Sequence, residues 1–177
     1  MNRDSVKQEI LSLPYNNILA MLPTSFGKSY IGIKWCEKHH PNSILIVVPR
    51  LVLIQNWKDE FIKWGKKELL DKVTFSTYAG IHKVGKVYEC TIFDEAHHIS
   101  PRVVEIIKTI QSPYNILLSA TVKETWIDIP TTTGAEASED GGTDGVFMHR
   151  HHIVAETKEA NDGGQGAQPH KHAIDIY

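Results

Sequence analysis

The sequence predicts an α/β fold with a doubly wound, mostly parallel sheet. Five short apolar runs, each bounded by polar or turn residues, recur along the first two thirds of the chain, as expected for buried strands. Segments with apolar residues at helical spacing separate several of these runs. Strands that are apolar on both faces need helices on both sides of the sheet and right-handed crossovers between neighbours.

The expected elements alternate along the chain. One predicted helix starts at a Gly-Lys-Ser, the next has apolar residues at helical spacing, and the third begins with a proline suited to a first helical turn. They cover Lys28–Lys38, Leu51–Gly65 and Pro101–Gln111. The predicted strands are Asn17–Leu22, Ser43–Pro49, Lys72–Tyr78, Glu89–Asp94 and Tyr114–Ala120.

Length and composition predict one domain with an appendage. The 177 residues, 41% hydrophobic and 23% charged, can bury one sizeable core, which we place at residues 1–129. Residues 130–177 are rich in glycine, acidic and small polar residues. We therefore expect a poorly structured, flexible acidic C-terminal tail.

Charge and cysteine usage narrow the functional classes. The net charge of -2 divides unevenly, with 16 basic and 13 acidic residues in 1–132 against 3 and 8 in 133–177. Residues 1–132 can therefore accept a polyanion, although their net charge alone would not create strong binding to nucleic acid. No signal peptide or membrane-length apolar run is visible, so we expect no association with a membrane. Cys36 and Cys90 fall in a predicted helix and a predicted strand, which suits buried thiols in a cytoplasmic protein.

A phosphate-binding loop is predicted after the first strand. The segment LPTSFGKS, Leu22–Ser29, has the spacing of such a loop except that Leu22 replaces the usual first glycine. Backbone amides at a helix N-terminus bind phosphate oxygens, and Gly27 permits close approach. Lys28 would reach the β and γ phosphates and Ser29 would offer its hydroxyl to Mg²⁺. Taken alone, an ordinary strand-to-helix turn is the alternative.

An acidic pair ends the fourth expected strand. In the run TIFDEAHHI, Asp94 and Glu95 follow an apolar stretch, and the carboxyl ends of neighbouring parallel strands form the ligand crevice of an open sheet. Asp94 would then hold the metal. Glu95 would orient and polarise the water that attacks the terminal phosphate of ATP.

Five segments in order resemble the motifs of superfamily 2 helicases. PTSFGKS, VVPRLVLIQNW, FSTYAG, DEAHH and SAT correspond to motifs I, Ia, Ib, II and III of the DEAD/DEAH-type enzymes, over roughly Arg3 to Thr121. The resemblance implies the N-terminal, helicase ATP-binding domain, a RecA-like P-loop NTPase that uses ATP and Mg²⁺.

Site residues follow from this resemblance by position. His97, Ser119 and Thr121 would couple the nucleotide site to the nucleic acid. Gln8 stands near the place of an adenine-reading glutamine, although the family's usual spacing after an arginine is not reproduced, and a solvated helix residue is the alternative. The implied nucleotide contacts are Pro23, Thr24, Ser25, Phe26, Gly27, Lys28 and Ser29.

Nucleic acid is the partner that the resemblance implies, with DNA favoured over RNA. Motifs Ia and Ib touch the sugar-phosphate backbone, which gives affinity without sequence reading. Trp57 and Trp64, spaced with Phe61 at helical intervals, are instead predicted on the core face. The implied nucleic-acid contacts are Pro49, Arg50, Gln55, Thr77, Tyr78 and Gly80.

A complete motor of this type also needs a second RecA-like domain, which supplies arginine fingers, and none fits after Thr121. The sequence leaves three possibilities open: a motor domain whose second half lies in a longer chain or a partner chain, a non-catalytic ATP- or nucleic-acid-binding module, and an inactive helicase fragment. The tail histidines lack the spaced Cys/His pairs of a zinc site, so solvent-exposed side chains are expected at His149, His151, His152, His170 and His172.

Overall fold

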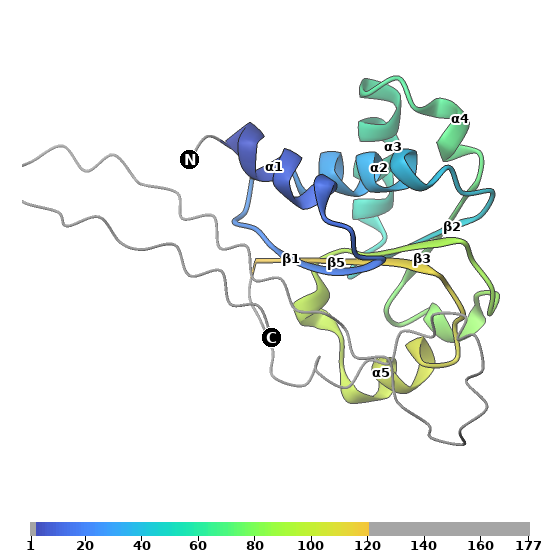
Figure 1. The fold of residues 1–177 in the computed structure, drawn as a ribbon. Coiled ribbons are helices and arrows are strands. Elements are labelled where there is room, and N and C mark those ends of the chain that lie inside the picture. The colour runs from blue at the N-terminus through green and yellow to red at the C-terminus, as the bar shows by residue number, and fades with distance from the viewer. Residues whose placement is uncertain (1–2, 121–177) are drawn as a thin grey trace, which may run out of the picture.

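The computed structural model describes residues 3–120, which form a five-stranded sheet between helices (Figure 1). Every pair of neighbouring strands is parallel, and the order across the sheet is β1-β5-β4-β2-β3. The predicted doubly wound parallel sheet is confirmed, because each strand lies inside its expected range. The strands are β1 (Asn17–Met21), β2 (Ile44–Val48), β3 (Val73–Thr77), β4 (Cys90–Phe93) and β5 (Tyr114–Ser119).

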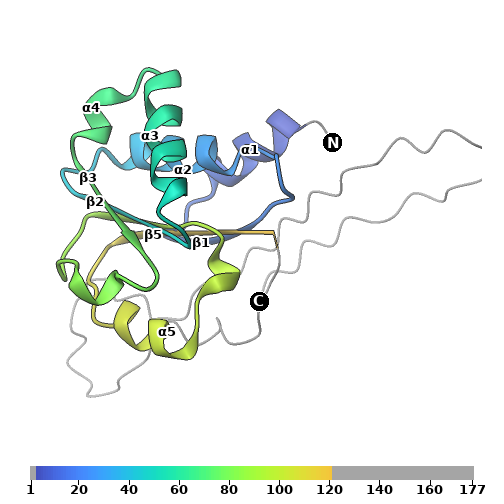
Figure 2. The same cartoon turned by 180° about the vertical axis from the view of Figure 1, so that it is seen from behind.

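Helices cover both faces of the sheet. The first four helices lie on one face and α5 on the other (Figures 1 and 2). Helix α5 is shorter than predicted, because the backbone after Ile107 changes to tighter bonds such as Thr109 N–H to the Ile106 carbonyl at 3.0 Å. The helices are α1 (Arg3–Ser12), α2 (Lys28–His39), α3 (Val52–Lys63), α4 (Lys67–Leu70) and α5 (Pro101–Ile107), with short 3₁₀ turns η1 (Ile81–Lys83) and η2 (Ala96–His98).

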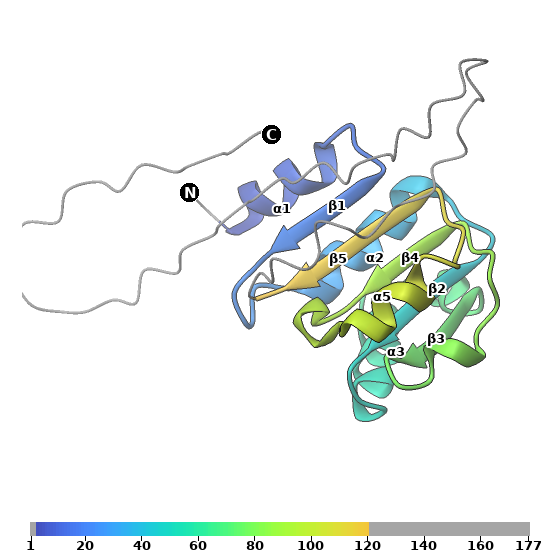
Figure 3. The same ribbon diagram turned by 90° about the horizontal axis from the view of Figure 1, so that it is seen from below.

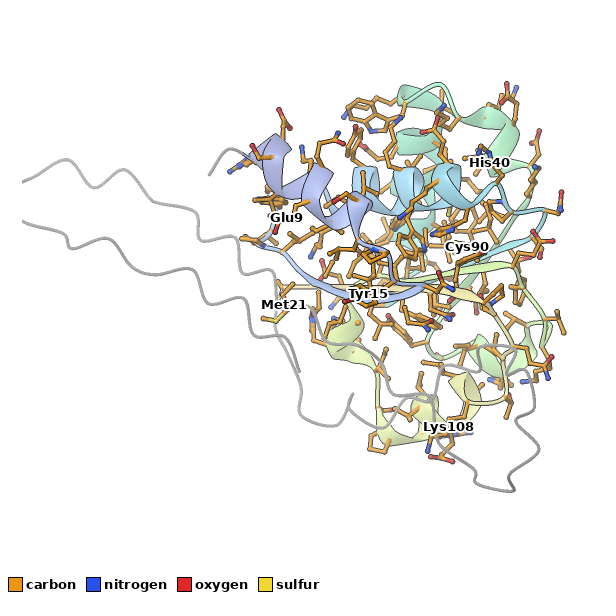
Figure 4. The ribbon with its side chains drawn as sticks, in the orientation of Figure 1. Glu9, Tyr15, Met21, His40, Cys90 and Lys108 are labelled. Carbon is orange, nitrogen blue, oxygen red and sulfur yellow. The ribbon has the colours of Figure 1, made fainter. Side chains whose placement is uncertain are left out.

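Two apolar layers fill the space between sheet and helices. The layer beneath α1, α2 and α3 contains Trp35 and Phe61, both fully buried. The layer on the α5 side contains Ile81 and Ile107. Cys90 lies in the interior (Figure 4), and with Cys36 it is a buried free thiol, as the sequence predicted.

The carboxyl ends of the strands meet at one edge of the sheet. Figure 3 shows the parallel arrows running to this edge, with β5 between β1 and β4. Two backbone bonds lock the loops there, from Leu22 N–H to the Ser119 carbonyl and from Asp94 N–H to the Val47 carbonyl, both at 2.8 Å. The phosphate-loop segment and the acidic pair are thereby brought to the same edge.

Within residues 3–120, no helix combines the length and the apolar character that crossing a membrane requires.

Candidate nucleotide site

The loop between β1 and α2 is shaped by two residues with positive φ. Ser25 has φ 66° and Gly27 has φ 93°, a region that is open to glycine and strained for other residues. Phe26 anchors the loop, because its side chain is buried in the core. Helix α2 begins at Lys28, and no side chain caps it. Its first-turn amides are therefore available to an anion.

The acidic pair reaches the loop from β4. Glu95 has φ 46°, and non-glycine residues held in such a conformation cluster at functional sites. Its Oε1 atom accepts a hydrogen bond from Lys28 Nζ at 2.5 Å. The structure thus joins the lysine of the loop to the second acid of the DEAHH segment, although they are 67 residues apart in sequence.

Besides the bond from its backbone N–H to Val47, three hydrogen bonds within residues 3–120 hold Asp94. Its Oδ2 accepts from Trp57 Nε1 at 2.9 Å, and its Oδ1 accepts from the Glu95 backbone N–H at 2.9 Å. The Tyr78 hydroxyl donates to the Asp94 carbonyl at 2.7 Å. Burial raises the pKa of the Asp94 carboxyl, and the bond from Trp57 and the charge of Lys28 oppose that rise.

His97 bridges two of the predicted segments. Its Nδ1 atom lies 3.4 Å from Glu95 Oε2 and 3.3 Å from Ser119 Oγ. Ser119 is the last residue of β5 and is fully buried. The side chain therefore links the acidic pair to the end of the neighbouring strand, while Thr121 lies outside the described residues.

A cleft of about 360 Å³ opens between the phosphate loop, α1 and α3. Both carboxylates of the acidic pair reach it. Within residues 3–120, no three His, Cys, Asp or Glu side chains gather into a metal cluster, so a cation here would need the loop hydroxyl or ligands from its substrate. The lining residues are Lys7, Ser25, Gly27, Lys28, Ser29, Tyr30, Leu53, Asn56, Trp57, Glu60, Lys63, Trp64, Asp94 and Glu95.

Sequence reasoning missed Lys7, which lines this cleft from α1. Its neighbour Gln8 is exposed and does not appear among the lining residues. Lys7 Nζ also stands 5.3 Å from the Tyr30 ring centroid, a cation–π distance. Among the other loop residues, Pro23 is half-buried and Thr24 is exposed, and neither lines the cleft.

The predicted nucleic-acid residues fall into different environments. Arg50 is exposed just before α3, and Gln55 is exposed on α3. Pro49 is half-buried just after β2. Thr77 Oγ1 accepts from the Gly80 N–H at 3.1 Å, so this pair shapes its own turn. Tyr78 is 6% exposed, and its hydroxyl donates to the Asp94 carbonyl. This buried position differs from the surface position that a contact with the sugar-phosphate backbone needs.

One core prediction was wrong. Trp57 and Phe61 are buried as expected, whereas Trp64 is 41% exposed. Helix α3 ends at Lys63, so Trp64 lies beyond its last turn. Its indole donates to Glu60 Oε2 at 2.9 Å, and its ring meets Tyr30 edge-on at a centroid distance of 4.7 Å.

The fold and the site define a class of protein. A phosphate loop after β1, an acidic pair after β4 and a serine at the end of β5 on a parallel sheet of this order characterise the first RecA-like domain of a superfamily 2 helicase or translocase. Residues 5–124 match the family model described as "Type III restriction enzyme, res subunit". The chain belongs to this family.

A curated relative supports the assignment. The chain is 30% identical over 117 residues to the DNA 3'-5' translocase XPB2 of Sulfurisphaera tokodaii, an alignment that covers 58% of this chain and 26% of that protein. The chain therefore spans about a quarter of the length of this relative.

Solved structures share the fold. The SWI2/SNF2 ATPase core domain of Sulfolobus solfataricus superposes with a TM-score of 0.54 at 20% identity, covering 72% of this chain and 33% of that one. The Hef helicase domain of Pyrococcus furiosus gives a TM-score of 0.52 at 17% identity, covering 67% and 32%. Each match leaves about two thirds of the longer protein unmatched.

Proposed function

We propose that this domain binds ATP with Mg²⁺ and hydrolyses it to drive movement along DNA. The observation that carries the proposal is the contact between Lys28 and Glu95 at 2.5 Å, because it brings a phosphate-binding cation and a candidate general base to one cleft. The family membership supports the use of ATP, and the similarity to a DNA 3'-5' translocase favours DNA over RNA.

The donor set suits the cation. Ser29 and Asp94 both line the cleft, and a hydroxyl with a carboxylate offers the hard oxygen ligands that Mg²⁺ prefers. We assign these two residues as its protein ligands. When bound, the cation would neutralise charge on the phosphate oxygens. It would also favour the ionised form of the Asp94 carboxylate, offsetting the effect of burial on its pKa.

The remaining residues divide the work between binding and proton transfer. The amides at the start of α2 and the ammonium group of Lys28 bind phosphate oxygens, with Gly27 allowing their close approach. As Lys28 engages phosphate, the carboxylate of Glu95 is released from its ion pair. Glu95 then accepts a proton from the attacking water, and His97 holds its other oxygen at 3.4 Å.

The nucleic-acid surface is proposed at the same edge of the sheet. Arg50 is exposed where β2 gives way to α3, and its guanidinium suits a phosphate contact. Gln55, with Pro49, Thr77 and Gly80, completes the proposed contact set. Tyr78 is buried beneath this surface and contributes by its hydrogen bond to the Asp94 carbonyl. A second RecA-like domain, in a longer chain or a partner chain, would supply the other half of the track. A cytoplasmic location fits this role and the two free thiols.

Steady-state ATP hydrolysis with and without single-stranded DNA, double-stranded DNA and RNA tests the proposal. Lys28→Ala should abolish turnover by weakening ATP binding. Glu95→Gln should lower turnover at least about 100-fold while ATP still binds. The matched control variants Lys83→Ala and Glu68→Gln change exposed residues outside the cleft and should behave as the wild type.

The outcome also separates the rival functions. Turnover that DNA stimulates and both site variants remove would support the motor. ATP binding without turnover under any condition would favour a non-catalytic binding module, and a chain that binds neither ATP nor nucleic acid would be an inactive fragment.

A further inference from the structure

Within residues 3–120, the side chain of Asp94 has one hydrogen-bond donor from outside its own segment. That donor is Trp57 Nε1, 2.9 Å from Oδ2, whereas Oδ1 accepts from the adjoining Glu95 N–H. Trp57 lies on α3, 37 residues earlier in the chain. The orientation of this carboxylate therefore depends on the placement of a different helix.

Trp57 itself is tightly held. Its side chain is 3% exposed and packs against Phe61 at a ring centroid distance of 6.3 Å. Gly32 of α2 makes room for it, because a Cβ at that position would lie 2.8 Å from Trp57 Cη2. A ring packed at interior density on several sides has little rotational freedom, so the direction of its indole N–H is fixed.

Helix α3 connects this ring to the exposed strand end. The helix begins at Val52, directly after Arg50 and Leu51, and Leu51 is 74% exposed. A continuous 12-residue helix carries a displacement at its first turn to Trp57, which lies less than two turns further on. The same element thus contacts solvent at one end and the Asp94 carboxylate along its length.

We propose that Trp57 is a positioning residue, whose indole N–H sets the Asp94 carboxylate for the divalent cation and ties that cation site to the start of α3. The inference rests on the proposed function, since it assumes that Asp94 is a cation ligand. Removing the hydrogen-bond partner of a metal-binding carboxylate typically changes the metal affinity by about 10- to 100-fold. A ligand that binds at the exposed start of α3 would therefore alter the cation site through the bond from Trp57 to Asp94.

The test measures the Mg²⁺ concentration for half-maximal binding of a fluorescent ADP analogue by the full chain. Trp57→Phe keeps an aromatic ring but removes the donor, and it should raise that concentration about 10-fold or more. Trp35→Phe makes the same replacement at a fully buried tryptophan that does not line the cleft and should leave that concentration within about twofold of the wild type. Binding without Mg²⁺ should be equal in all three proteins.

A second measurement needs no change at Trp57. In a ¹H–¹⁵N spectrum of the wild type, with four indole signals from the four tryptophans, the indole N–H groups of the buried Trp35 and Trp57 should exchange slowly with solvent. The signal that tests the inference is that of Trp57, which donates to Asp94. It should shift and exchange faster in Asp94→Asn, because a neutral amide is a weaker acceptor than a carboxylate.

The outcomes distinguish the inference from the proposed function. If Trp57→Phe binds the analogue with the wild-type Mg²⁺ requirement, or if no indole signal responds to Asp94→Asn, the inference is overturned and the proposed function stands. If the wild type itself fails to bind nucleotide at any Mg²⁺ concentration, the proposed function is overturned and the inference falls with it.

Discussion

Asn115 offers a sharp test of how the sheet is held together at the edge opposite the cleft. It is 7% exposed, near the start of β5. Its Nδ2 donates to Asn17 Oδ1 at 2.8 Å and to the Ser112 carbonyl at 2.9 Å. Its Oδ1 accepts from the hydroxyl of Thr91, which is fully buried. One side chain therefore connects β1, β5 and β4.

Asn115→Ala should destabilise the domain by about 3 kcal/mol. Three buried partners lose a hydrogen bond, and each costs about 1 kcal/mol when its group stays buried. In a domain of this size, this corresponds to a fall in Tm of roughly 10 °C. Urea unfolding followed by circular dichroism measures the change. Nucleotide affinity should not change, because the network lies at the amino ends of the strands.

Two comparisons decide whether the network is responsible. Asn16→Ala removes a neighbouring exposed amide and should stay within about 0.5 kcal/mol of the wild type. In a double-mutant cycle with Thr91→Val, the two losses should be less than additive, because the residues share a bond. A loss below about 1 kcal/mol for Asn115→Ala, or strict additivity in the cycle, would refute the reasoning.

Two further predictions concern a half-buried histidine and a pair of buried thiols. Burial, with the charges of neighbouring basic residues, lowers the pKa of His39 from 6.5 to about 4. The unfolded chain therefore binds a proton first, and stability should fall as the pH drops from about 6.5 to about 4. His39→Phe should flatten this part of a stability-against-pH profile, and an unchanged slope would count against the assignment. The hydrogen bond between the Cys36 and Cys90 thiols, together with burial, raises the pKa of the Cys90 thiol. Since both free cysteines are buried, neither should react with Ellman's reagent until urea unfolds the protein. Immediate reaction of one thiol in the native state would contradict this.

Four of the strands, β1, β2, β4 and β5, were predictable because they are buried on both faces almost throughout, whereas the edge strand β3 is only partly buried. The run from Ile44 to Val48 is fully buried, so its period and its length both indicate a central parallel strand. The joining of Lys28 to Glu95 was also within reach, because parallel strands bring their carboxyl ends to one edge. The boundaries of 1–129 and 130–177 remain predictions, since both lie outside residues 3–120, which the structure describes.

Other features needed the structure. Trp57 and Trp64 sit on the same helical stripe in the sequence, yet one is buried and the other lies past the end of α3. Gly65, which has φ 66°, stands just beyond this end, but a glycine in the sequence places the end of a helix only to within a residue or two. The bond from Trp57 to Asp94 depends on the order of β2 and β4 in the sheet, which the alternation of elements does not specify. Nothing in the sequence pattern marked Lys7 as a residue of the nucleotide cleft, except that it stands beside Gln8.

Equilibrium binding of Mg²⁺–ATP to the wild type, Lys28→Ala and Lys83→Ala tests the central claim most directly, namely that the loop ending in Lys28 and the acidic pair ending in Glu95 form one nucleotide site. We expect the wild type and the exposed-lysine variant Lys83→Ala to bind ATP equally. Lys28→Ala should lose most of the affinity, because the principal phosphate-binding charge is gone. Wild-type affinity in Lys28→Ala would contradict the claim.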